Sequence, residues 1–220
     1  MKNPISYSLK TEIWPFLILF ATVALSFCSY PLLPDMVVSH WNFSGQANGW
    51  SSREFQVIFF PAFLFGLYLL LSLVPKFDPQ AQRYLEFATV YRIIRNLILL
   101  MLFVVFVAST FANLGYTLNI GVIVASSVGL LMIALGNYFG KLKRNFFIGI
   151  RTPWTLSSEN VWNKTHRLGS RLFIIWGLGL ILSPWLNSSL AYIILFGGII
   201  VMISWLMIYS YTLYKKEQQK

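Results

Sequence analysis

Residues 136–171, GNYFGKLKRNFFIGIRTPWTLSSENVWNKTHRLGSR, form the stretch around which the remaining sequence is organised. Long apolar runs flank the stretch on both sides, yet it carries seven basic residues and a single acidic one, Glu159. It also holds two tryptophans and one of the two histidines of the chain. A connection of this length is unusual inside a compact fold and is more often functional. We therefore expect a functional segment that apolar helices hold in place.

The composition is that of an integral membrane protein. Of the 220 residues, 57% are hydrophobic and 11% are charged, whereas soluble domains average about 25% charged residues. One bilayer crossing needs about 20 apolar residues. The fold class is therefore all-α, a polytopic membrane protein with six transmembrane helices. We expect these helices at residues 13–33, 56–74, 93–113, 118–139, 172–186 and 192–213.

The basic residues predict the orientation of the chain. With the N-terminus in the cytoplasm, sixteen of the seventeen Lys and Arg residues, Lys2 and Lys220 among them, lie in inner segments, and only Arg53 lies outside. This distribution follows the positive-inside rule, and it explains the net charge of +10 without direct nucleic-acid binding. Both termini and the central stretch are expected in the cytoplasm, and residues 34–55 outside.

The central stretch resembles the signature of a known family. Gly136 and Asn137, Asn145, the run GIRTPWTL at 149–156, Trp162 and the run KTHR at 164–167 resemble the SdpI/YfhL family of bacterial membrane proteins. The resemblance implies a multi-pass plasma-membrane protein that gives immunity to a peptide toxin, which for the best-known members of the family is the sporulation-delaying peptide toxin. It implies that such a protein binds the toxin, captures a cytoplasmic autorepressor or other regulator, or does both. The signature residues that we expect to matter are Asn137, Asn145, Gly149, Arg151, Thr152, Pro153, Trp154, Thr155, Trp162, Lys164, Thr165, His166 and Arg167.

A second resemblance lies in the predicted outer loop. Pro34, His40, Asn42, Gly45, Gly49 and Ser52 resemble the short extracytoplasmic motif of DUF1648, a domain of unknown function that often precedes the SdpI segment. Asn48 and Arg53 stand where that motif has Asp and Lys. Together with Trp41, the loop offers an aromatic, hydrogen-bonding surface for a hydrophobic peptide. The alternative is a compact re-entrant turn held by its own tryptophans.

These features divide the chain into three segments. Residues 1–75 form a DUF1648-like segment with two crossings and the outer loop 34–55. Residues 76–117 form a connection and the third crossing. Residues 118–220 form an SdpI-like segment with three crossings and the cytoplasmic signature loop 140–171.

Two interpretations of the signature loop remain open. In one, its Lys and Arg residues set topology, Trp154 and Trp162 anchor the interface, and Arg151 binds lipid phosphate. In the other, Arg151 and His166 contact a partner. Because Pro153 favours extended backbone before it, we expect Thr155 or Ser157 to cap a short amphipathic helix along the inner membrane surface.

The sequence argues against several chemistries. No Ser or Cys nucleophile has a companion base, and the carboxylates lack metal-ligand spacing, so we expect no catalytic site, metal or cofactor. No Asp, Glu, Lys or Arg falls in the middle of a predicted crossing, which disfavours a coupled transporter. We expect an immunity and signalling protein with membrane lipids, a peptide toxin and a cytoplasmic regulator as partners. The alternative is a membrane-embedded enzyme or lipid-handling protein in which Arg151 and Lys164 hold a phosphate and His166 is acid or base.

Overall fold

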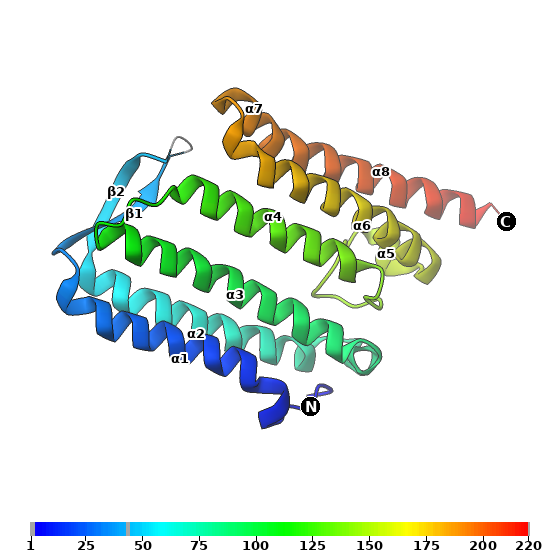
Figure 1. The fold of residues 1–220 in the computed structure, drawn as a ribbon. Coiled ribbons are helices and arrows are strands. Elements are labelled where there is room, and N and C mark those ends of the chain that lie inside the picture. Colours follow the sequence, from blue (N-terminus) through cyan, green and yellow to red (C-terminus); the bar gives the residue numbers. More distant parts are fainter. Residues whose placement is uncertain (1–2, 43–44, 220) are drawn as a thin grey trace.

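The computed structural model describes residues 3–42 and 45–219, so Lys2 and Lys220 lie outside the described residues. Six long helices run back and forth along the bundle (Figure 1). All six are long and apolar enough to cross a membrane, as the sequence predicts. They are α1 (Leu9–Ser29), α2 (Arg53–Phe77), α3 (Ala88–Asn113), α4 (Ile120–Phe139), α6 (Glu159–Leu182) and α8 (Gly198–Gln218).

The shorter elements connect these helices at the two ends of the bundle. The loop between α4 and α6 contains the one-turn helix α5 (Pro153–Ser157). A π-helical turn, η4 (Ile193–Gly197), leads from α7 (Ser188–Tyr192) into α8. Three 3-10 turns complete the connections, namely η1 (Tyr30–Leu32), η2 (Ala81–Glu86) and η3 (Ser183–Trp185).

The order in which the helices pack on one another determines where the candidate sites lie. Helices α1, α2 and α3 pack on one another, α3 packs on α4, α4 packs on α6, and α6 packs on α8. The first residues of α1, the last residues of α8 and the loop containing α5 lie at one end of the bundle (Figure 1). The opposite end carries the connection between α1 and α2 together with α7.

Glycines bring α4 and α6 into direct backbone contact. A Cβ atom added at Gly129 would lie 2.6 Å from the Gly177 carbonyl oxygen, and one at Gly136 would lie 2.7 Å from the Ser170 carbonyl oxygen. Small residues at a crossing let two helices pack closely where lipid supplies no hydrophobic driving force between them. This crossing fixes the two helices that carry the signature loop between them.

The fifth crossing begins earlier than the sequence predicted. Ser158 caps α6, its side-chain oxygen accepting from the Val161 amide at 3.3 Å. No proline interrupts the sequence before Leu182, so the predicted amphipathic surface helix and the fifth crossing are one continuous helix. The expectation of a separate helix capped by Thr155 or Ser157 was wrong.

The outer loop contains a β-hairpin, whereas only turns were expected there. Strand β1 (Met36–Trp41) pairs antiparallel with β2 (Ala47–Ser52), and Met36 lies opposite Ser52. The register shifts on both sides of His40. Val37 is completely buried, which fixes the hairpin against the ends of the helices. An exposed loop with a single buried aliphatic residue gives only a weak strand signal.

Candidate functional site

Asn145 organises the signature loop from its interior. Its side chain is fully buried, and Oδ1 accepts from the amides of Phe147 at 3.0 Å and Ile148 at 2.8 Å. Nδ2 donates to the carbonyls of Lys143 at 2.8 Å and Ile148 at 3.0 Å. Only a carboxamide offers donors and an acceptor together at this size. Asn145 therefore closes the turn at both ends.

Gly149, Trp162 and His166 form the second part of the loop interior. His166 is 1% exposed, its Nε2 accepts from the Ile150 amide at 3.0 Å, and its Nδ1 lies 2.9 Å from the Trp162 carbonyl oxygen. Since Nε2 is an acceptor, Nδ1 carries the hydrogen and the ring is neutral. The ring stacks on the Trp162 indole with 4.0 Å between centroids, and the indole nitrogen donates to the Leu142 carbonyl at 2.8 Å.

The glycine at 149 is required by two separate features. Its φ is +116°, a region that side chains rarely adopt, and a Cβ there would lie 2.5 Å from His166 Nε2. The main chain therefore approaches the imidazole ring at a distance that only glycine permits.

Thr152 and Thr155 tie the loop to the last helix. Each accepts from the amide of the other, at 3.1 Å and 2.9 Å, which forms a reciprocal cap for α5. The Thr152 hydroxyl also donates to Ser210 Oγ of α8 at 3.0 Å. Trp154 packs against Tyr211 with 5.1 Å between ring centroids. The run TPWT thus forms a capped turn that is clamped on α8.

The structure separates the expected signature residues into two groups. The interior group is buried, and it comprises Asn145, Thr152, Thr155, Trp162, Thr165 and His166. Gly149 and Trp154 are half-buried. The exposed group comprises Asn137, Arg151, Pro153, Lys164 and Arg167. His166, which the sequence paired with Arg151 as a partner contact, lies inside the loop, whereas Arg151 is at the surface and donates to the Phe146 carbonyl.

The signature loop is docked on the connection between α2 and α3. Asp78 is 2% exposed and accepts from the Phe146 amide at 2.9 Å and from the Tyr84 hydroxyl at 3.0 Å. The Tyr84 oxygen also lies 3.2 Å from Asn145 Oδ1. Burial, and then the neighbouring Asp78 carboxylate, raise the pKa of Tyr84. Sequence reasoning missed Asp78 and Tyr84, because nothing in their spacing relates them to the distant loop.

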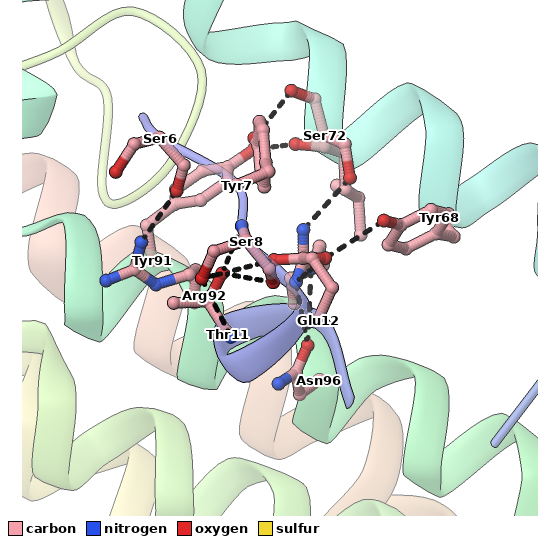
Figure 2. Close-up of polar contacts among 12 residues, drawn as sticks. Ser6, Tyr7, Ser8, Thr11, Glu12, Tyr68, Ser72, Tyr91, Arg92 and Asn96 are labelled. Carbon is pink, nitrogen blue, oxygen red and sulfur yellow. Dashed lines mark hydrogen bonds and ion pairs between the residues drawn. The ribbon is translucent and has the colours of Figure 1, made fainter. Parts of the chain in front are cut away.

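A second group of charged and polar side chains joins the beginning of α1, the end of α2 and the first half of α3. Figure 2 shows Glu12, Tyr68 and Ser72 of this group. Glu12 Oε2 of α1 and Arg95 Nη2 of α3 lie 2.8 Å apart, and the two side chains are 4% and 1% exposed. From α2, the Tyr68 hydroxyl donates to the same carboxylate oxygen at 2.9 Å, and Ser72 Oγ accepts from Arg95 Nη1 at 3.0 Å.

The sequence placed Glu12 just before the first predicted crossing, 13–33, and Arg95 at the beginning of the third, 93–113, so it gave no reason to pair them. Ser8 could have indicated the earlier start of α1. Its side chain caps the helix by accepting from the Thr11 amide, and the helix therefore includes Glu12. The pair lies near the ends of α1 and α3, so the middles of the crossings stay free of charge.

A cavity lies at the opposite end of the bundle, beneath the hairpin. Its volume is about 560 Å³, and it is bordered by β1 and by parts of α3, α4, α6 and α7. Three of the expected outer-loop residues, His40, Trp41 and Asn42, line it. Most of the other lining side chains are apolar, and none is Asp, Glu, Lys or Arg.

The remaining outer-loop residues shape the hairpin. Gly45 has a φ of +75°, and a Cβ at Gly49 would lie 3.0 Å from the Cβ of His40. His40 Nδ1 lies 2.6 Å from Asn48 Oδ1. Pro34 is exposed just before β1. Within residues 3–42 and 45–219, no group of three His, Cys, Asp or Glu side chains could hold a metal ion.

The six long apolar helices define a multi-pass membrane protein. Comparison with known protein families identifies two segments of the chain. Residues 141–210 match the SdpI/YfhL protein family, and residues 17–65 match the domain of unknown function DUF1648. The resemblance seen in the sequence is thus confirmed: an SdpI/YfhL segment follows a DUF1648 segment.

One curated relative is similar over nearly its whole length. The chain is 26% identical over 210 residues to the Immunity protein SdpI of Bacillus subtilis (strain 168), which covers 94% of this chain and 98% of the relative. No solved structure matches the chain significantly.

Proposed function

We propose that this protein protects its own cell against a membrane-active peptide toxin, which it binds at the hairpin end of the bundle. The observation that carries the proposal is the end-to-end similarity to an immunity protein. That similarity spans the hairpin as well as the signature loop, so both ends of the molecule are included. A match confined to the loop would support a cytoplasmic role alone.

The distribution of charge supports a cytoplasmic position for the signature loop. The first turn of α1, the connection between α2 and α3, the signature loop and the end of α8 lie at one end of the bundle (Figure 1). These segments carry nearly all of the basic residues. By the positive-inside rule this end faces the cytoplasm. The hairpin and its cavity then face the medium from which a toxin arrives.

The exposed basic residues of the loop offer a surface for a cytoplasmic regulator. Lys164, Arg167 and Arg171 are all exposed and recur at helical spacing along one face of α6. Arg151 is exposed on the adjoining loop. An acidic partner fits such a surface through charge complementarity. In this proposal the buried signature residues hold the surface in shape, and His166 acts from behind it.

The catalytic alternative finds no support in the geometry of the loop. Both ring nitrogens of His166 are engaged by main-chain groups, and the ring is 1% exposed. An acid or base needs to be within hydrogen-bond reach of a substrate. His166 has no such access.

Survival of toxin-treated cells tests the proposal. A strain sensitive to the sporulation-delaying peptide toxin should keep its viability and membrane potential when it expresses the full chain, and lose both with the empty vector. Arg151→Ala should leave the amount of membrane-inserted protein unchanged, whereas His166→Ala should lower it because it removes a buried scaffold group. Equal killing of expressing and non-expressing cells, at normal protein levels, would refute the proposal.

A further inference from the structure

We propose that the cavity beneath the hairpin binds an extended, uncharged, apolar segment of a peptide, which adds as a strand beside β1. The inference rests on the proposed function and names the site and the chemistry of the ligand. It comes from three features: the strand edge that borders the cavity, the side chain that caps this edge at one point, and the absence of charge from the lining.

The border of the cavity on the hairpin side is a strand edge. Ser39, His40, Trp41 and Asn42 all line it, and these are four consecutive residues. Side chains of a strand alternate between its two faces, so one face would contribute only every second residue. The register shifts on both sides of His40 break this alternation, so the consecutive residues place the end of β1 at the cavity without identifying its edge. The pairing identifies the edge: β2 lies along one edge of β1, and Asn113 contacts the main chain of Val38 on the other.

The Asn113 side chain already makes the two hydrogen bonds that a neighbouring strand would make at the start of this edge. Asn113 Oδ1 accepts from the Val38 amide at 2.7 Å, and Asn113 Nδ2 donates to the Val38 carbonyl at 3.0 Å. A paired strand would make the same two contacts with one residue of β1. Asn113 makes these contacts with Val38, and the residues of β1 that follow Val38 line the cavity. Strand addition to such an edge is a common mode of peptide recognition.

The far wall of the cavity suits apolar side chains. Val105 of α3, Val124 and Val128 of α4, Leu180 of α6 and Leu195 of η4 contribute to it. The volume of about 560 Å³ lies within the range of about 300–1,000 Å³ for ligand sites. A strand beside β1 would direct alternate side chains toward this wall, so an apolar segment fits.

The charges at this end favour a peptide over a phospholipid. Lys and Arg side chains favour anionic phospholipid headgroups, and the lining contains neither. Arg53 is the basic residue of this end of the described chain, and it is engaged by Asp35 at 3.3 Å and Glu54 at 3.2 Å. The main chain of an uncharged peptide needs only the donors and acceptors that a strand edge supplies.

Filling the cavity tests the site. The full-length protein in lipid nanodiscs would be titrated with fluorescently labelled sporulation-delaying peptide toxin. Ala125→Trp and Val128→Trp place an indole in the cavity from α4, and each should raise the Kd at least tenfold. Leu130→Trp adds an indole to the same helix at a position that is 60% exposed, and it should change the Kd less than twofold. Size-exclusion profiles verify that all three variants are folded.

The mode of binding has its own readout. A toxin peptide with isotope-labelled carbonyls should show a strand-type amide I band when bound to the wild-type protein, and should lose it with Ala125→Trp. A helical band in the bound peptide would overturn strand addition. A phospholipid that co-purifies with the wild type and is missing from Ala125→Trp, while both proteins bind the peptide equally, would overturn the peptide as occupant.

Failure of this inference can be distinguished from failure of the proposed function. If cells expressing Ala125→Trp and Val128→Trp survive the toxin as well as wild-type cells, and the Kd is unchanged, the cavity is not the site while immunity stands. If wild-type cells are not protected, the proposed function fails and the site assignment fails with it.

Discussion

At the scale of single residues, many signature side chains are buried and hold the loop in shape. Asn145 and His166 each satisfy main-chain groups that would otherwise be buried without partners, and an unpaired buried polar group costs about 1–3 kcal/mol. The loop therefore keeps its shape with little help from secondary structure. Residues that look like a binding motif in the sequence are here the support of a surface formed by Arg151 and its neighbours.

Gly149→Ala tests this scaffold. We expect the substitution to destabilise the protein, because the positive φ alone costs about 1–3 kcal/mol and the new Cβ would lie 2.5 Å from His166 Nε2. The thermal unfolding midpoint in detergent should fall clearly. Gly140→Ala is the matched control, since Gly140 has helical φ and ψ and its Cβ would meet only Ser170 Oγ at 3.8 Å. Equal midpoints for the two variants would contradict the packing account.

The residue types of the site were predictable, but their roles were not. The GIRTPWTL and KTHR runs lie within the segment 141–210 that matches the SdpI/YfhL family, and Arg151 is exposed as its charge suggests. Burial of His166 could not be predicted, because it depends on the Ile150 amide reaching the ring across the fold of the loop. Asp78 and Tyr84 are far from the loop in sequence and meet it only in three dimensions.

At the scale of elements, α1, α2 and α3 are joined by polar contacts as well as apolar ones. Pro75 lies within α2 and has no amide hydrogen, so the carbonyl of Leu71 lacks its helical donor. The Tyr91 hydroxyl of α3 donates to this carbonyl instead. The Glu12–Arg95 pair lies close by, and the Tyr7 hydroxyl donates to the Ser72 carbonyl at 2.7 Å. These contacts fix the relative positions of the three helices at one end.

A double-mutant cycle measures the strength of this connection. Arg95→Met leaves Glu12 buried without its cation, and loss of one partner of a buried pair costs about 3–5 kcal/mol. The double variant Glu12→Leu with Arg95→Met should be less destabilised than Arg95→Met alone, as followed by denaturant unfolding in detergent. Lys143→Met is the control. Its pair with Glu86 is 3.7 Å long with side chains 42% and 49% exposed, so the expected loss is below about 1 kcal/mol. Additive effects in the cycle would show that the pair is not coupled.

The number of helices followed from the apolar runs, but several boundaries did not. Hydropathy measures where side chains meet lipid, whereas a helix begins where its first turn is capped. Ser158 therefore begins α6 well before the apolar run at residue 172. The hairpin was missed because its strands are held by Val37 and the distant Asn113, and not by an alternating pattern.

At the scale of the whole molecule, the bundle has two chemically different ends. One end contains the basic loop, and the other contains the uncharged cavity and the hairpin. Every assignment of toxin-facing and regulator-facing surfaces depends on which end faces the cytoplasm.

Cysteine labelling decides the orientation. Cys28→Ser removes the single native thiol and supplies the background. Trp50→Cys on β2, at a position that is 57% exposed, should react with a membrane-impermeant maleimide in intact cells. Arg151→Cys should react only after the cells are permeabilised. Labelling of residue 151 from outside intact cells would reverse the assignment of both surfaces.

The position of Ile5 also affects how this protein is completed during synthesis. Ile5 is 2% exposed in a cluster that includes Tyr84, Leu142 and Trp162. Ile5 therefore waits for a binding site that exists only after the residues up to Trp162, which come much later in the chain, have been synthesised. A bulky group attached just before Ile5 would be held next to this late-forming site, whereas one attached at the exposed last residues of α8 would leave its closure undisturbed.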